Sequence, residues 1–412
     1  MFAFHNGWLH AESVPLEAIA REFGTPCYVY SRSDLCAALT RFQAACDGRD
    51  ALVCYAMKAN SNLAILNLFA GMGAGFDIVS GGELARVIAA GGDPAKVIFS
   101  GVGKSQAEMR YAMETGILCF NVESAPELAR LAAVADAMGR RAPVSFRVNP
   151  DVDARTHPHI STGLKDTKFG VEFDAALDLY RAASRLPQIE VVGIDCHIGS
   201  SLSDYAPLIE ALDKMLELVD RLADEGIRLR HLDLGGGLGI RYRDEAPPDV
   251  GAYVRAVFAR VGARKLKLLF EPGRNLVGNA GVLLTRIEYL KHGAARNFAV
   301  VDAAMNDLIR PVLYDAWHDI VPVRNSGEPR AVYDVVGPVC ESADFLGKER
   351  ELALREGDLL AVMSAGAYAM CMSSNYNSRP RAAEVMVDGS KTHLIRERER
   401  IDALFALEHL LL

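Results

Sequence analysis

From about residue 50 onward, short apolar runs alternate with longer stretches in which apolar residues recur at helical spacing. This alternation is typical of β-α units, whose parallel strands are buried between helices. Eight such units in about 220 residues predict an α/β fold, a (β/α)8 barrel, and a doubly wound open sheet is the alternative. The predicted strands are Leu52 to Met57, Phe76 to Val79, Val97 to Phe99, Leu118 to Val122, Val144 to Val148, Val191 to Cys196, His231 to Leu234 and Leu266 to Phe270.

The stretches between these runs carry helix signals, as in the segments that begin at Ser80 and Ser124 and in the long segment Asp204 to Glu225. Ser124 has the pattern of an N-cap, because a proline follows in the first turn and Glu127 lies three residues after it. These segments are therefore predicted to be the outer helices of the barrel.

After Arg274 the pattern changes to strand-like runs separated by Gly, Pro and Asn. The runs are Val282 to Ile287, Phe298 to Val301, Ala331 to Val336 and Leu359 to Met363. We therefore expect a C-terminal β-rich domain, sandwich-like or barrel-like, over residues 275–412, after a barrel over residues 31–274. Residues 1–30 contain the strand-like Cys27 to Tyr30 and are expected to join the β-rich domain.

Composition narrows the possible partners and compartment. A net charge of -8 and a pI of 5.7 argue against binding to nucleic acid or to an anionic membrane surface. The sequence shows neither a secretory signal pattern nor a run of about 18 apolar residues, so a cytoplasmic location is expected. The eight cysteines are scattered singly, which predicts reduced thiols, seven of them inert in the core.

Functional residues of such a barrel lie at the carboxyl ends of its strands. Lys58 follows the first predicted strand, where a lysine is costly unless it is paired, neutral or covalently used. A structural salt bridge and a catalytic amine are both consistent with this position.

Two later loops have the features of a phosphate site. Strand seven runs into Gly235, Gly236 and Gly237, and strand eight runs into Glu271, Pro272, Gly273 and Arg274. Glycine backbone lets N–H groups approach phosphate oxygens, and these two loops form the usual phosphate site of the fold. A triple glycine alone is more often a simple turn.

The remaining candidates are Glu271, which could face a ring nitrogen or form a buried ion pair, and His197, which could stack on a flat cofactor or be a core histidine. Asp77 and Glu83 are ambiguous alone. A lysine, a carboxylate, a histidine and phosphate loops together indicate pyridoxal phosphate, whose ring is an electron sink when its nitrogen is protonated. No metal is expected.

These motifs resemble the fold-type III pyridoxal-phosphate-dependent decarboxylase family nearly from end to end. Tyr55 to Asn60, His197 to Ser200, Gly235 to Gly237 and Glu271 to Arg274 are of the kind shared across the family. Three later segments resemble the diaminopimelate decarboxylases within it: Met305 to Tyr314, Gly337 to Ser342, and Gly366 to Arg381. Ser201 and Ala304 depart from the family pattern, where Gln and Gly are usual.

The resemblance implies decarboxylation of meso-2,6-diaminopimelate to L-lysine and CO2, the last step of lysine biosynthesis by that route. It implies that Lys58 forms the Schiff base, that His197 stacks on the ring and that Glu271 pairs with its nitrogen, supported by Asp77 and Glu83. It places phosphate against Ser200, Gly235 to Gly237, Gly273, Arg274 and Tyr368. It also assigns substrate binding to Arg274, Arg310, Tyr314, Glu341 and Tyr368.

The same resemblance makes Cys340 the proton donor and places Cys340 and Glu341 in the partner's active site, which implies a homodimer with shared sites. A decarboxylase for ornithine, arginine or a carboxylated polyamine is the main rival, since it would share the cofactor residues. Arg310 discriminates between them, because an arginine suits a second substrate carboxylate rather than an amine. A barrel racemase and a noncatalytic pyridoxal-phosphate carrier are less consistent with the C-terminal motifs.

Overall fold

A computed structural model describes residues 2–153, 168–325 and 327–411. The chain divides into two compact units. The barrel unit comprises Leu39–Ile240 and Ala246–Asn275, and the β-rich unit comprises Met1–Ala38, Arg241–Glu245 and Leu276–Leu412. Each unit is described by itself below.

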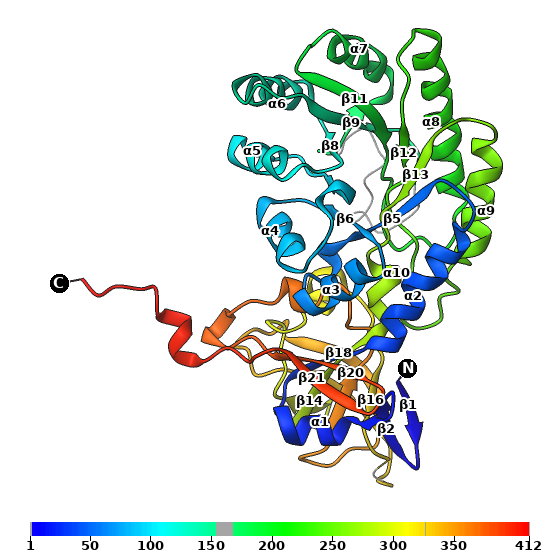
Figure 1. Ribbon diagram of the computed structural model, residues 1–412. Helices are drawn as coiled ribbons and strands as arrows, with labels where there is room; N and C mark the ends of the chain where they lie inside the picture. Colours follow the sequence, from blue (N-terminus) through cyan, green and yellow to red (C-terminus); the bar gives the residue numbers. More distant parts are fainter. Residues whose placement is uncertain (1, 154–167, 326, 412) are drawn as a thin grey trace. The chain divides into compact units, whose positions relative to one another are not determined.

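The barrel unit is built on a closed ring of parallel strands, which confirms the predicted fold (Figure 1). Successive strands pair in chain order, and the last strand of the ring pairs with the first, so the open sheet is excluded. The ring strands are β5 (Ala51–Ala56), β6 (Gly75–Ile78), β7 (Val97–Phe99), β8 (Cys119–Val122), β9 (Ala142–Asn149), β11 (Ile189–Asp195), β12 (His231–Asp233) and β13 (Lys267–Phe270). The two-residue β10 (Val171–Glu172) adds to β9.

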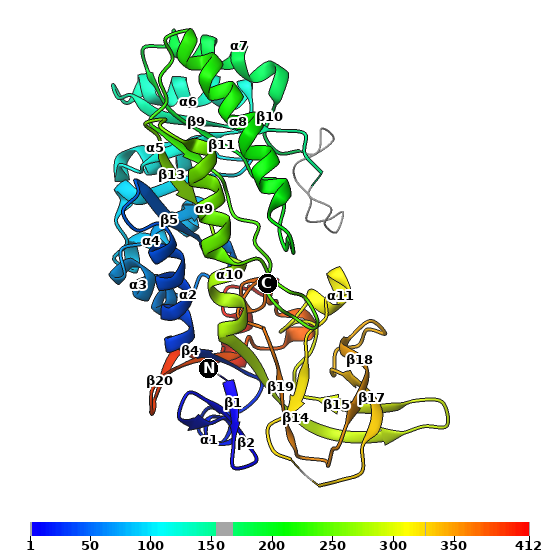
Figure 2. The same ribbon diagram turned by 90° about the vertical axis from the view of Figure 1, so that its right-hand side faces the viewer.

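Helices surround this ring, as the two views of Figures 1 and 2 show. Ser124 accepts a hydrogen bond from the Glu127 N–H at 3.2 Å, which confirms the predicted N-cap. The helices are α2 (Arg32–Ala45), α3 (Leu63–Gly71), α4 (Gly81–Ala89), α5 (Gln106–Thr115), α6 (Ala125–Ala137), α7 (Phe173–Ser184), α8 (Ala206–Asp224), α9 (Val250–Val261) and α10 (Arg274–Val277).

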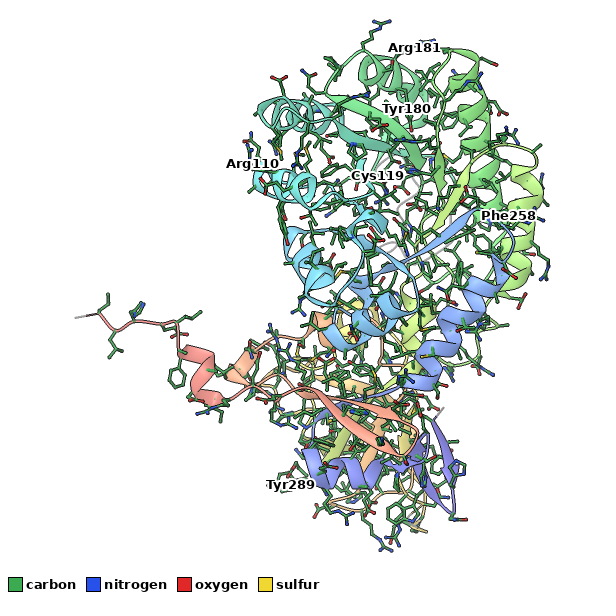
Figure 3. The ribbon with its side chains drawn as sticks, viewed as in Figure 1. Arg110, Cys119, Tyr180, Arg181, Phe258 and Tyr289 are labelled. Carbon is green, nitrogen blue, oxygen red and sulfur yellow. The ribbon has the colours of Figure 1, made fainter. Side chains whose placement is uncertain are left out.

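An apolar cluster that includes Ile98, Cys119 and Leu269 is buried among the ring strands, because strands covered on both faces have no solvated side. Cys119 lies inside the ring of strands, whereas Arg181 lies on the outer surface of α7 (Figure 3). One interior contact depends on a missing side chain: a Cβ at Gly193 would lie 2.0 Å from Nε2 of His231 on the neighbouring strand. Gly193 therefore makes the room that the buried His231 ring occupies.

The β-rich unit is a mixed sheet of order β18-β17-β15-β14-β4-β20-β21, with β19 also paired to β14 and to β16. The segment Cys27–Ser31 forms β4, which lies between β14 and β20 in this sheet. The other strands of this path are β14 (Gly281–His292), β15 (Asn297–Val301), β17 (Ala331–Val336), β18 (Phe345–Leu352), β20 (Ala383–Asp388) and β21 (Lys391–Arg396), and the two strands off the path are β16 (Ile320–Pro322) and β19 (Leu359–Val362). A small sheet of β1 (Phe2–His5), β2 (Trp8–Ala11) and β3 (Val14–Pro15), with α1 (Leu16–Phe23) and α11 (Arg310–Tyr314), completes the unit.

One expectation about the cysteines is wrong. Cys27, Cys46, Cys54, Cys119 and Cys196 are buried, but Cys371 is exposed like Cys340, and Cys36 is half-buried. Cys371 lies in the 3-10 turn Met370–Met372, in which Met370 is the buried residue. Within the described residues, no helix is both long and apolar enough to cross a membrane.

Gly193→Ala should lower the free energy of unfolding by roughly 1 to 3 kcal/mol, because the new methyl group must displace the buried ring of His231. Gly71→Ala is the matched control, since a Cβ at Gly71 would have no neighbour within 4 Å. Urea unfolding of both variants measures the difference. Equal stability of the two variants would contradict the close approach of His231.

Candidate active site

Lys58 lies in a 3-10 turn directly after β5 and is paired with Asp77 from the adjacent strand β6. Its Nζ is 2.7 Å from Oδ2 of Asp77. The Asp77 side chain is fully buried, whereas that of Lys58 is 37% exposed. A buried carboxylate thus holds the Lys58 amine, while part of the lysine side chain stays exposed. This arrangement suits an amine that takes part in catalysis.

Glu83 lies in the first turn of α4, next to the end of β6. Its Oε2 accepts a hydrogen bond from the Val79 N–H at 2.6 Å, and Ser80 caps the same helix. Burial and, to a lesser extent, the nearby charge of Asp77 raise the pKa of Glu83 to about 7, against the lowering effect of the hydrogen bond from the Val79 N–H. The structure therefore places Asp77 and Glu83 together with Lys58.

Three more carboxyl groups meet at the ends of β11, β12 and β13. Candidate ligand atoms of Asp195, Asp233 and Glu271 all lie within 4.8 Å of one another, and all three residues are buried. Burial and repulsion by neighbouring carboxylates raise the pKa of Asp195 and of Glu271 well above ordinary values. Burial and the charge of Asp77 raise the pKa of Asp233 to about 6, against the lowering effect of the Gly235 N–H. Such carboxyl groups can hold protons without a metal ion.

Glu271 has one buried oxygen, Oε1, for which the described residues supply no hydrogen-bond partner. An unsatisfied buried carboxyl oxygen is costly, and a protonated ring nitrogen would satisfy it. This oxygen fits the contact expected of a pyridoxal-phosphate ring.

The loop Gly235 to Gly237 holds the ring of His197 through its Nδ1 atom. The Gly236 N–H donates to Nδ1 of His197 at 3.3 Å, so the proton of the neutral ring is on Nε2. Burial lowers the pKa of His197 well below its ordinary value, and the charges of Arg147 and Lys58 lower it further. A Cβ at Gly235 would lie 2.6 Å from that same Nδ1, so a side chain there would collide with the ring.

Backbone contacts join the three loops at this end of the barrel. The Glu271 N–H donates to Gly235 O at 2.7 Å, the Leu202 N–H donates to Gly237 O at 2.9 Å, and Arg274 Nη2 lies 3.4 Å from Ser200 Oγ. A Cβ at Gly236 would lie 2.4 Å from Glu271 O. The loops are therefore bare and close-packed, as a phosphate cradle requires.

The β-rich unit carries the other predicted residues, and Arg310 is the most constrained of them. Arg310 begins α11 and is only 6% exposed. Its guanidinium lies 5.1 Å from the ring centre of Tyr242 and 5.9 Å from that of Tyr314. Its Nε lies 3.2 Å from Nε2 of His318. The predicted pair Arg310 and Tyr314 is thus in contact.

Cys340 and Glu341 lie in a turn between β17 and β18 and are exposed. The Cys340 N–H donates to Asn377 Oδ1 at 3.0 Å, and Tyr376 Oη donates to Glu341 Oε1 at 2.5 Å. Tyr368, in the loop after β19, has a φ of 53°. This conformation costs a non-glycine residue about 1 to 3 kcal/mol and is concentrated at functional sites.

Sequence reasoning missed Asp195, Asp233, Tyr242 and His318. Asp195 and Asp233 are the last residues of β11 and β12, so the rule that selected strand ends could have found them. Tyr242 and His318 belong to no motif, and only the folded β-rich unit brings them to Arg310.

Comparisons with known proteins agree with this geometry. The family described as "Pyridoxal-dependent decarboxylase, pyridoxal binding domain" matches residues 32–278. The diaminopimelate decarboxylase of Pseudomonas aeruginosa is 60% identical over 410 residues, covering 100% of this chain and 99% of the relative. That of Vibrio cholerae is 59% identical over 407 residues, covering 98% of each. A crystal structure of diaminopimelate decarboxylase from Helicobacter pylori complexed with L-lysine superposes with a TM-score of 0.93 at 41% identity, covering 95% of this chain and 99% of that one.

The chain therefore belongs to the pyridoxal-dependent decarboxylase family and is a decarboxylase that uses pyridoxal phosphate. Within that family it groups with the diaminopimelate decarboxylases, which match it over its whole length.

Asp233→Asn should change how stability depends on pH in the cofactor-free protein. The folded pKa of Asp233, about 6, exceeds its ordinary value of 3.8, so its protonated form stabilises the fold at low pH. This contribution is lost as the pH rises through about 6. The free energy of unfolding of the wild type, minus that of the variant, should therefore fall between about pH 4 and pH 7. Asp224→Asn, at an exposed position, is the control, and a pH-independent difference for Asp233→Asn would contradict the buried carboxyl cluster.

Proposed function

We propose that the chain converts meso-2,6-diaminopimelate to L-lysine and CO2, with Lys58 as the residue that carries the cofactor. The observation that carries the substrate assignment is 60% identity over the whole chain with a diaminopimelate decarboxylase. The buried Arg310 between two tyrosine rings supports it, because a guanidinium suits a substrate with a second carboxylate.

Pyridoxal phosphate, when bound, accepts the electron pair left behind as CO2 departs. The protein's share is to hold, orient and protonate. Lys58 supplies the amine for covalent attachment, and Asp77, at 2.7 Å, is the acceptor that takes or returns its proton. Glu271 would accept a hydrogen bond from the ring nitrogen through Oε1, and neutral His197 would present its ring face.

Phosphate would be bound by the cradle of Ser200, Gly235 to Gly237, Gly273 and Arg274, with Tyr368. A cation and bare backbone N–H groups are the donors that a phosphate needs. Pro272, between Glu271 and Gly273, restricts the backbone of the last of these loops, because its ring fixes φ.

Substrate binding and protonation are assigned to residues of the β-rich unit, together with Arg274 of the barrel unit. Arg310 and Tyr314 would hold the distal carboxylate, and Arg274, Glu341 and Tyr368 would complete the substrate contacts. Cys340 is exposed in this chain, so its thiol is accessible to a second copy. We propose that Cys340 and Glu341 act in the active site of a second copy, which requires a homodimer.

Lys58→Ala should lose the visible absorbance of the lysine-bound cofactor and nearly all CO2 release, because no other amine takes its place beside Asp77. Lys96→Ala, on the surface of the same unit, is the control. An unchanged absorbance band in Lys58→Ala would rule out Lys58 as the attachment site.

The Lys58→Ala variant also tests whether two copies of the chain share each active site. Cys340→Ala should be inactive while binding cofactor, whereas Cys371→Ala, at the other exposed cysteine, should stay active. Mixing Lys58→Ala with Cys340→Ala under conditions of subunit exchange should restore activity, since one site of each hybrid has both residues. Proven exchange without recovery would contradict a shared site.

Arg310→Ala should reduce kcat/KM for diaminopimelate by at least about 30-fold, because a charge-assisted contact in a desolvated pocket contributes about 2 to 5 kcal/mol. The absorbance of the bound cofactor should not change, since Arg310 is assigned to neither ring nor phosphate. Arg324→Ala is the control, because that exposed arginine stacks on Trp8 in the same unit. Wild-type kcat/KM in Arg310→Ala would refute the assignment.

A further inference from the structure

His318 is a fully buried histidine whose two ring nitrogens have different partners. It lies two residues before β16, with none of its surface exposed. Its Nδ1 is 2.8 Å from the carbonyl oxygen of Met363, and its Nε2 is 3.2 Å from Nε of Arg310. Neither contact belongs to any motif in the sequence.

These partners determine where the proton of the ring lies. A carbonyl oxygen can only accept a hydrogen bond, so Nδ1 must carry the hydrogen. The Nε–H of an arginine can only donate, so Nε2 of His318 must accept. The neutral ring with its proton on Nδ1 is the form that satisfies both contacts, and an imidazolium would set a hydrogen against that of Arg310.

The same contact restricts how Arg310 can bind a carboxylate. A guanidinium offers two kinds of edge for bidentate binding, a side edge of Nε with one Nη and an end edge of the two Nη groups. His318 engages Nε and so occupies the side edge. The Tyr242 ring, 5.1 Å from the guanidinium, also meets the His318 ring edge-on at 5.3 Å, so the histidine and arginine share one aromatic wall.

We propose that His318 is a positioning residue that fixes the rotation of Arg310, so that its end edge receives the distal carboxylate of the substrate. This inference rests on the proposed role of Arg310. It adds that specificity depends on a neutral, Nδ1-protonated histidine which itself does not touch the substrate.

Two substitutions separate the two contacts. His318→Asn keeps an amide donor near Met363 O but removes the acceptor for Arg310, whereas His318→Gln can extend an amide oxygen to the place of Nε2. His318→Asn should raise KM for diaminopimelate by at least about tenfold while kcat changes little, because the guanidinium loses its fixed rotation. His318→Gln should stay within about threefold of the wild-type KM.

Urea unfolding of both variants shows whether the histidine is merely structural. Equal rises in KM that follow equal losses of stability would overturn the positioning role. Arg310→Ala separates the proposed role of Arg310 from that of His318. Unchanged kcat/KM in Arg310→Ala refutes the proposed function, whereas a large loss there with unchanged KM in His318→Asn refutes only the role of His318.

A measurement on the wild type keeps the test decisive if both variants fail to fold. Nitrogen NMR of the holoenzyme labelled with 15N-histidine distinguishes the two neutral tautomers and the imidazolium by their ring shifts. The proposal requires that the buried ring of His318 is neutral, with a hydrogen on Nδ1 and none on Nε2. Finding every buried histidine of the β-rich unit as imidazolium or as the Nε2–H tautomer would overturn it.

Discussion

Asp77, Asp195, Asp233 and Glu271 are carboxyl groups buried at the end of the barrel that carries Lys58, and the arrangement of the site follows from how each is compensated. Asp77 is compensated by the ammonium of Lys58, and Asp233 by the Gly235 N–H at 2.9 Å. Each of the four retains one buried oxygen for which the described residues supply no hydrogen-bond partner, and Asp195 and Glu271 also have strongly raised pKa values. Since isolated buried carboxylates are too costly to keep, this end of the barrel is suited to bind positive charge. A protonated ring nitrogen and a lysine amine are the cations that the family's chemistry provides.

The β-rich unit contains a buried positive charge, the guanidinium of Arg310. Arg310 is surrounded by aromatic rings, and a neutral histidine accepts its Nε–H. These neighbours leave its charge intact, because rings and a neutral imidazole bring no counter-charge. An arginine in such surroundings suits a substrate that carries its own carboxylate, which is why we propose that this unit contributes to specificity.

Much of the barrel could be predicted because its strands are short, largely apolar and separated by helices, several of which have a side-chain cap. Strand ends then pointed to Lys58, Asp77 and Glu271, since parallel strands all end at one rim. The β-rich unit was harder. In β18 the run Lys348 to Glu351 is charged, and Glu349 has a φ of 54° beside a register shift, so no alternation of apolar residues marks the strand. His318 could not be found either, because Met363, its partner, lies 45 residues away along the chain.

The substrate preference of the wild-type enzyme tests the central claim most directly. With pyridoxal phosphate bound, CO2 release would be measured for meso-diaminopimelate, ornithine and arginine under the same conditions. The account predicts that kcat/KM for diaminopimelate exceeds that for either amine-tailed substrate by at least about 100-fold, since a substrate lacking the group its site is built to bind leaves buried polar groups unpaired. Comparable or higher values with ornithine or arginine would contradict it.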